Sequence, residues 1–85
     1  MRVIIPTQLR SYTRVAEVQA QGLTLAELLQ DLDRQFPGIR FRMINEQDAI
    51  REHIKIFVNR ETAENLNYRL KPDDTVRIIG ALSGG

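Results

Sequence analysis

The stretch that decides the fold class of this chain spans residues 24–38 and reads TLAELLQDLDRQFPG. Its apolar residues recur at steps of three and four, a spacing that places them on one face of a helix. Thr24 is the expected cap: its hydroxyl can accept a hydrogen bond from the amide of Glu27, whose carboxylate reaches back. Pro37 and Gly38 end the segment. The predicted apolar face consists of Leu25, Leu28, Leu29, Leu32 and Phe36.

Apolar segments with β-branched residues lie on both sides of this helix in the sequence. Residues 2–6 predict a strand that stops at Pro6, which lacks a backbone donor. Residues 15–20 predict a weaker strand, paired with the first as an antiparallel hairpin. Two further strands are predicted at residues 54–58 and 75–79. One helix packed on a mainly antiparallel sheet is an α+β domain of two layers.

The remaining segments are predicted as connections. Gln21 and Gly22 break the second strand, and a turn is expected at residues 71–74, where Pro72 takes the second position. We expect a polar loop over residues 7–14, a connection with some extended structure over residues 39–51, and a short helical turn that includes Leu66 and Leu70.

Composition excludes several classes of function. The chain has 85 residues, which indicates a single domain, and its twelve basic and eleven acidic residues give a net charge of +1. Because no like charges cluster, we expect no nucleic-acid partner. No apolar run has the length of a membrane span or a signal peptide, so we expect no membrane partner and a cytoplasmic location. The absence of cysteine excludes disulfides, thiolate metal sites and cysteine nucleophiles.

Candidate catalytic side chains are scarce. His53 is the sole histidine, and we interpret it as a polar residue at a strand edge rather than a catalytic group or metal ligand. We predict no catalytic residue, no metal site and no cofactor bound by this chain itself. The carboxylates on the polar side of the predicted elements, Glu17, Glu27, Asp31 and Asp33, are expected to form a solvated surface.

The residues after the last predicted strand are different in kind. We expect a domain over residues 1–80 and a reactive tail over residues 81–85, which ends in Gly84 and Gly85. Glycine has no Cβ, so its backbone can enter a narrow channel in a partner enzyme. The terminal carboxylate, with an ordinary pKa of about 3.5, is ionised at neutral pH. It can attack the α-phosphate of ATP to give an acyl adenylate, and sulfide can then replace AMP to leave a thiocarboxylate. Sulfur carried on the main chain agrees with the absence of cysteine.

Residues 76–85, VRIIGALSGG, resemble the end of the ubiquitin-like β-grasp sulfur carriers. These include the small subunit of molybdopterin synthase, the thiamine-pathway carrier and a carrier used in cysteine synthesis. Residues 70–76 are similar to the turn and strand entry typical of that fold. Residues 5–10, 40–51 and 54–59 resemble the cysteine-synthesis type most. At position 80 this chain has Gly, where many relatives have Pro.

The resemblance implies a ubiquitin-like β-grasp fold, a mixed sheet packed on one main helix, with a flexible C-terminal Gly-Gly tail. It also implies that an adenylating enzyme related to the ubiquitin-activating family charges Gly85, using ATP and magnesium held in its own site. The residues Ala81, Leu82, Ser83 and Gly84 would enter that active site. A second enzyme would accept the sulfur, either a cysteine synthase that carries pyridoxal phosphate or the large subunit of molybdopterin synthase.

Three alternatives to a carrier for cysteine synthesis stay open at this point. The chain could be the small subunit of molybdopterin synthase, which donates sulfur to the molybdenum cofactor. It could be a ubiquitin-like modifier conjugated to lysine through Gly85, or a plain interaction module.

A docking patch is predicted from the alternation of the last two strands. Phe57 and Ile79 alternate with Ile56 and Ile78, so the two pairs face opposite sides of the sheet. If Ile56 and Ile78 lie in the core, Phe57 and Ile79 form an exposed apolar patch for partner proteins. The alternative is that both strands are buried on both faces.

Overall fold

The fold is taken from a computed structural model that describes residues 1–80. The predicted tail over residues 81–85 therefore lies outside the described residues. The elements, in chain order, are β1 (Arg2–Ile4), the 3-10 helix η1 (Thr7–Leu9), α1 (Arg10–Thr13), β2 (Glu17–Gln19), α2 (Leu25–Gln35), α3 (Ile39–Met43), β3 (Ile54–Val58), β4 (Glu61–Thr62) and β5 (Thr75–Gly80).

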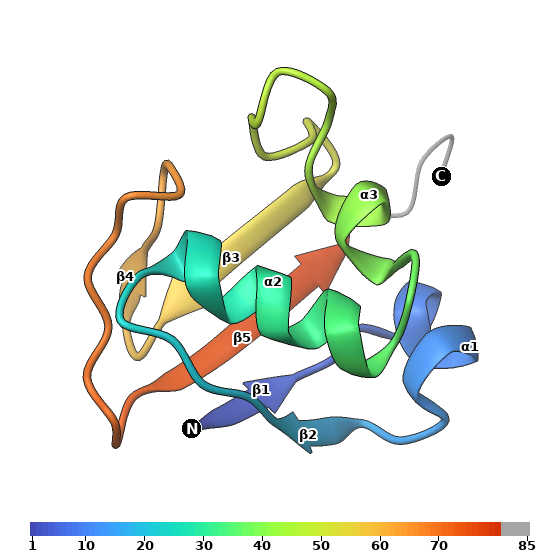
Figure 1. The fold of residues 1–85 in the computed structure, drawn as a ribbon, viewed down its shortest axis with the longest axis horizontal. Coiled ribbons are helices and arrows are strands. Elements are labelled where there is room, and N and C mark those ends of the chain that lie inside the picture. Colours follow the sequence, from blue (N-terminus) through green and yellow to red (C-terminus); the bar gives the residue numbers. More distant parts are fainter. Residues whose placement is uncertain (81–85) are drawn as a thin grey trace.

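The strands form one five-stranded sheet in the order β2-β1-β5-β3-β4. The predicted antiparallel hairpin of β1 and β2 is confirmed, and β5 pairs with β3 in antiparallel orientation. The pairing of β1 with β5 is parallel, so the sheet is mixed. Figure 1 shows β5 running through the middle of the sheet while α2 crosses in front of it. The two predicted layers, one helix layer on one sheet, are present.

The predicted helix is confirmed as α2. The Thr24 hydroxyl accepts a hydrogen bond from the Glu27 amide at 3.3 Å. The Glu27 carboxylate reaches back to the amide of Leu23 at 2.9 Å, one residue before the cap. The two bonds together satisfy amide donors that would otherwise lack partners at the start of the helix. Four of the five predicted face residues, Leu25, Leu28, Leu29 and Leu32, are fully buried, and Phe36 packs against the same core.

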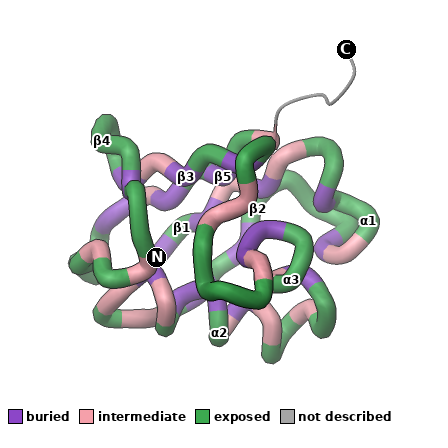
Figure 2. The backbone as a smooth tube through the Cα atoms, turned by 90° about the horizontal axis from the view of Figure 1, so that it is seen from above, coloured by how far each residue is buried: buried purple, intermediate pink, exposed green. Residues whose placement is uncertain are grey.

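Strand register builds the other half of the core. Val18, Val3, Val76 and Val58 lie opposite one another in that order across four strands, and all are buried. Ile56 and Ile78 form the neighbouring buried pair. Each such side chain contributes about 1.5–3 kcal/mol when it is fully removed from water. Figure 2 shows the resulting alternation of buried and exposed stretches along the backbone.

The predicted polar loop over residues 7–14 is wrong, because the segment folds into η1 and α1. Leu9 is only 2% exposed and Thr13 only 6%, so two well-spaced side chains are enough to hold this short helical segment on the core. The segment ends at Arg14, which has a left-handed φ of 66°.

The predicted connection over residues 39–51 begins instead with the short helix α3. Ile39 and Met43 are buried on its inner side. Gly38 precedes it with a φ of 97°, and one Asp33 oxygen accepts hydrogen bonds at 3.1 Å from the amides of Gly38 and Arg40. The extended part of the prediction survives as a single bridge between Ile44 and Ile50.

The predicted helical turn is confirmed only as a turn at Leu66 and Asn67, and Leu70 instead follows a bridge between Arg69 and Thr24. The segment lies along the start of α2, where the Leu66 carbonyl accepts from the Ala26 amide at 3.0 Å and the Leu70 amide donates to the Leu23 carbonyl at 2.9 Å. The turn predicted at residues 71–74 is confirmed by a hydrogen bond from the Asp74 amide to the Lys71 carbonyl.

Gly22 lies where the chain passes close to α2 on its way from β2. A Cβ at this position would lie 2.5 Å from the Leu28 nitrogen and 2.9 Å from the Glu27 carbonyl carbon, both of them backbone atoms. Glycine thus permits an approach that no other residue allows, which goes beyond the strand break predicted from the sequence.

Candidate functional site

The residues predicted to carry the chemistry, Gly85 and the tail residues before it, lie outside the described residues. The structure describes the end of β5, from which these residues continue. Gly80 is the last residue of β5 and pairs with Ile54 at the start of β3. On its other side, the Gln8 side chain donates a hydrogen bond from Nε2 to the Gly80 carbonyl oxygen at 2.8 Å.

The two predicted docking residues lie on the sheet face opposite α2. Ile79 is 42% exposed, and Phe57 is half-buried, whereas Ile56 and Ile78 are buried on the helix side. The alternative in which both strands are buried on both faces is therefore wrong. Phe57 lies opposite Arg77, and Ile79 lies opposite Lys55, so the two apolar residues are diagonal neighbours.

A further apolar residue joins this face from β1. Ile4, which is half-buried, pairs with Arg77, which in turn pairs with Phe57. Ile4, Phe57 and Ile79 thus form an apolar patch around Arg77, with Lys55 at its side; we call these five residues the outer-face patch. Ile4 is not predicted from the sequence, because only the parallel pairing of β1 with β5 brings it here. The alternation that selected Phe57 and Ile79 also selects Lys55 and Arg77.

The charges of the outer-face patch are both positive. Three ion pairs occur within residues 1–80, and neither Arg77 nor Lys55 takes part in them. Farther along the same face, Arg2 and Glu17 pair at 2.9 Å across the β1–β2 hairpin. A hydrogen bond from Arg2 lowers the pKa of the Glu17 carboxyl. The patch therefore offers exposed apolar surface together with two cations that a partner can pair.

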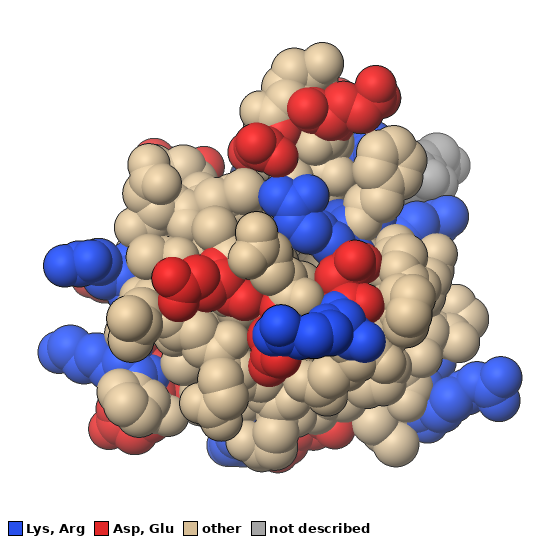
Figure 3. All heavy atoms as spheres, in the orientation of Figure 1, with Lys and Arg blue, Asp and Glu red and all other residues tan. Residues whose placement is uncertain are grey.

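The α2 side of the molecule has no comparable single-sign surface. In Figure 3 basic and acidic side chains are interspersed over this side. His53 is exposed and lines a shallow depression of about 290 Å³ together with Phe41, Arg42 and Arg51. Within residues 1–80, no group of three or more His, Asp or Glu residues is placed to hold a metal ion.

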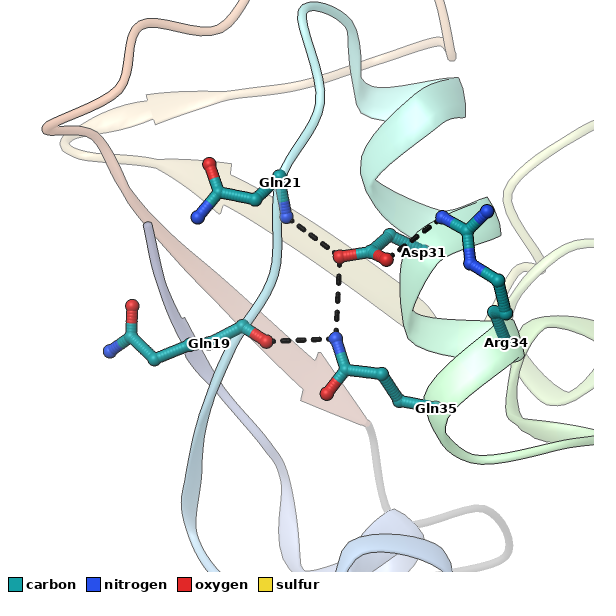
Figure 4. A network of polar contacts seen from close by, with 5 residues as sticks. All are labelled: Gln19, Gln21, Asp31, Arg34 and Gln35. Carbon is teal, nitrogen blue, oxygen red and sulfur yellow. Dashed lines mark hydrogen bonds and ion pairs between the residues drawn. The ribbon is translucent and has the colours of Figure 1, made fainter.

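The carboxylates expected to form a solvated surface do lie at the surface, and they also have structural partners. Figure 4 shows Asp31 of α2 accepting hydrogen bonds from the Gln21 amide and the Arg34 guanidinium, each at 2.9 Å, and from the Gln35 carboxamide at 3.3 Å. The same Gln35 group donates to the Gln19 carbonyl at 2.9 Å. The hydrogen bond from Arg34 lowers the pKa of the Asp31 carboxyl most, and the hydrogen bond from the Gln21 amide lowers it further. This network ties α2 to β2, which gives Asp31 a structural role rather than that of a general acid or base.

Comparison with known proteins finds relatives both in sequence and in structure. The chain is 33% identical over 89 residues to the sulfur carrier protein CysO of Mycobacterium tuberculosis, covering 98% of this chain and 96% of the relative. It is 34% identical over 76 residues to a ubiquitin-related modifier 1 homolog from Bombyx mori, covering 86% of this chain and 70% of the relative. A crystal structure of the Amycolatopsis orientalis BexX/CysO complex contains a chain that superposes with a TM-score of 0.90 at 33% identity, over 99% of this chain and 98% of that one.

These findings define the class of protein. The fold is the ubiquitin-like β-grasp fold, and the protein is a sulfur carrier that acts with partner enzymes rather than as a catalyst. The chain matches the ThiS family over residues 3–85 and belongs to that family. The resemblance to the cysteine-synthesis carriers seen in the sequence is thereby confirmed. No helix within residues 1–80 combines the length and apolar character needed to cross a membrane.

Proposed function

We propose that the Gly85 carboxylate is the sulfur-carrying group and that it delivers sulfur for the synthesis of cysteine in the cytoplasm. The observation that supports this most is the likeness to CysO over 98% of the chain. An adenylating enzyme related to the ubiquitin-activating family, with ATP and magnesium in its own site, would activate the carboxylate. The carboxylate oxygen attacks the α-phosphate of ATP and pyrophosphate leaves. Hydrosulfide then attacks the carbonyl carbon and AMP leaves, which gives the thiocarboxylate.

Transfer of the sulfur needs a second protein. We propose a cysteine synthase that carries pyridoxal phosphate as the acceptor, with Ala81, Leu82, Ser83 and Gly84 inside its active site and Gly85 at the reacting centre. A thiocarboxylate suits this step because sulfur is softer and more polarisable than oxygen, and therefore a better nucleophile. Glycine at the last two positions keeps the reacting end narrow.

Mass spectrometry of the intact protein tests the proposal. After incubation with the activating enzyme, ATP, magnesium and sulfide, the chain should gain about 16 Da, the difference between a sulfur and an oxygen atom. The gain should map to the peptide that contains Gly85, and a chain without Gly85 should not acquire it. An unchanged mass of the full chain, with an activating enzyme shown to charge its own known carrier, would refute the proposal.

Conjugation to lysine is the second candidate function. It is favoured by the likeness to the ubiquitin-related modifier 1 homolog. A modifier and a carrier share the adenylated intermediate but differ in its fate. Tryptic peptides that carry residues 78–85, IIGALSGG, on a lysine, found in cells that express the chain and absent when Gly85 is deleted, would identify a modifier. A thiocarboxylate without such remnants would identify a carrier alone.

We further propose that the outer-face patch is the surface by which the activating enzyme holds the carrier. Two properties support this: its apolar residues are accessible, and β5, which carries Arg77 and Ile79, leads directly to Gly80. The two cations predict an acidic rim on the partner, which steers association and fixes register.

Ile79→Asp tests this surface, because it replaces an exposed apolar contact with a negative charge. An apolar pocket would not accommodate that charge, and an acidic rim would repel it. Val15→Asp is the matched control, since Val15 is 50% exposed and lies outside the sheet. We expect the KM of the activating enzyme for Ile79→Asp to rise about tenfold or more, as at an interface hot spot, with unchanged melting temperature. An equal effect of the two variants would contradict the assignment.

A further inference from the structure

The contact between Gln8 and Gly80 has no counterpart in the functional prediction made from sequence. The two residues are 72 positions apart, and a 2.8 Å hydrogen bond runs from the Gln8 carboxamide to the Gly80 carbonyl oxygen. Gly80 directly precedes the predicted reactive tail, residues 81–85, which ends in Gly85. Gln8 therefore holds the last described backbone carbonyl before the reactive segment.

Topology explains why a side chain makes this contact. β1 runs parallel to β5 up to the pair of Ile4 and Arg77, and the chain then leaves the sheet at Pro6. β5 continues to Gly80 beyond the last β1 pair. A backbone carbonyl at the end of a strand needs a donor from another source once its neighbouring strand has departed. The Gln8 carboxamide supplies that donor.

The backbone that carries the Gln8 side chain is held in place by the core. Leu9, the next residue, is 2% exposed in the core, and its amide donates to the Pro6 carbonyl at 3.0 Å. The backbone of η1 is thus fixed by core packing, although the Gln8 side chain itself is exposed. A donor on a fixed backbone can determine the orientation of the group that it binds.

Position 80 is complementary to this arrangement. A Cβ on Gly80 would lie 3.1 Å from both Cδ and Oε1 of Gln8, closer than side chains normally pack. The backbone of Gly80 is not in the left-handed region, so alanine is permitted there by its φ. What opposes a side chain at position 80 is the Gln8 carboxamide. Glycine lets that group lie against the main chain.

We propose that Gln8 is a positioning residue that sets the direction in which the chain leaves β5, and so orients Gly85 for the activating enzyme. The inference rests on the proposed function. By fixing the Gly80 carbonyl in the free carrier, Gln8 reduces the number of directions open to the following residues before docking. Placing a reacting group in advance accelerates its reaction without strengthening the contacts of the docked surfaces.

Steady-state kinetics of adenylation, with the carrier as the varied substrate, separate positioning from docking. Gln8→Ala should lower kcat about three- to tenfold, the factor that corresponds to one ordinary hydrogen bond, while KM stays within about twofold. Gln30→Ala is the matched control, because it removes the same side chain from an exposed position on α2. It should leave both constants unchanged. All variants are assayed at a temperature at which thermal melts show them folded.

A double-mutant cycle with Gly80→Ala tests whether the two residues act through one contact. In the parent chain Gly80→Ala should displace the carboxamide and lower kcat by a similar factor. In the Gln8→Ala background it should add little, because the space is then free. Additive losses, a KM effect with unchanged kcat, or wild-type kinetics of Gln8→Ala would overturn the inference while leaving the carrier function intact. Failure of the wild-type chain to be adenylated would overturn both.

Discussion

Replacing Gly22 by alanine places a methyl group against the backbone of α2. The new Cβ would lie 2.5 Å from the Leu28 nitrogen and 2.9 Å from the Leu28 Cα atom. Neither side can give way freely. The helix is held by buried side chains, and the segment that contains Gly22 is held by hydrogen bonds on both sides, from the Gln21 amide to Asp31 and from the Leu23 amide to Glu27, each at 2.9 Å.

The expected loss of stability follows from these contacts. Overpacking against a fixed backbone costs about 1–3 kcal/mol. A shift large enough to relieve the clash breaks one of the two flanking hydrogen bonds, which costs about 1 kcal/mol more. Alanine restricts the unfolded chain more than glycine, which offsets about 0.4–1 kcal/mol. The free energy of unfolding should therefore fall by about 1–3.5 kcal/mol for Gly22→Ala.

Thermal and urea unfolding measure this change. For a domain of this size the melting temperature should fall by roughly 4–28 °C. Gly80→Ala serves as the control, because the atoms that its Cβ would meet belong to the movable Gln8 side chain, so its melting temperature should change far less. If Gly22→Ala unfolds with the same free energy as the wild type, the close approach of this segment to α2 does not exist in solution.

Two further predictions concern α2. Leu28→Ala removes a fully buried side chain, so urea unfolding should show a loss of about 2–5 kcal/mol, and a loss below 1 kcal/mol would contradict its place in the core. Asp31→Asn removes the carboxylate whose pKa is lowered by Arg34 and the Gln21 amide. Because the folded-state pKa lies below the ordinary value of 3.8, the stabilisation by Asp31 is complete well above that pH and is lost as the pH falls through the lowered pKa. Thermal melts should therefore show Asp31→Asn less stable than the wild type at pH 7, with the gap narrowing on acidification; a gap independent of pH would contradict this account.

The sequence predicts the elements whose signals are local. The spacing from Leu25 to Leu32 predicts α2, and the alternation along residues 54–58 predicts β3, both confirmed. The segments η1, α1 and α3 escape prediction because each is only three to five residues long and is held by only one or two buried residues, such as Leu9 or Ile39 and Met43. Their stability depends on tertiary packing rather than on propensity.

The candidate site divides in the same way. Phe57 and Ile79 follow from alternation within two strands, and the structure places them on the face opposite α2. Ile4 and Gln8 come from the first ten residues and reach the site through the parallel pairing of β1 with β5. No periodicity within one segment indicates which distant strand will become its neighbour. The use of Gly85 stays a prediction, because it lies outside the described residues.

The central place of β5 has a consequence for quality control. Without β5, the sheet would separate into two hairpins, β1 with β2 and β3 with β4, which do not pair with each other. Isolated two-stranded hairpins are at best marginally stable in water. A chain truncated before residue 75 should therefore present no intact sheet for an activating enzyme to hold. An enzyme that binds the sheet thereby selects chains in which the strand leading to the reactive segment is present. Binding alone then distinguishes intact from truncated chains, without a separate proofreading step.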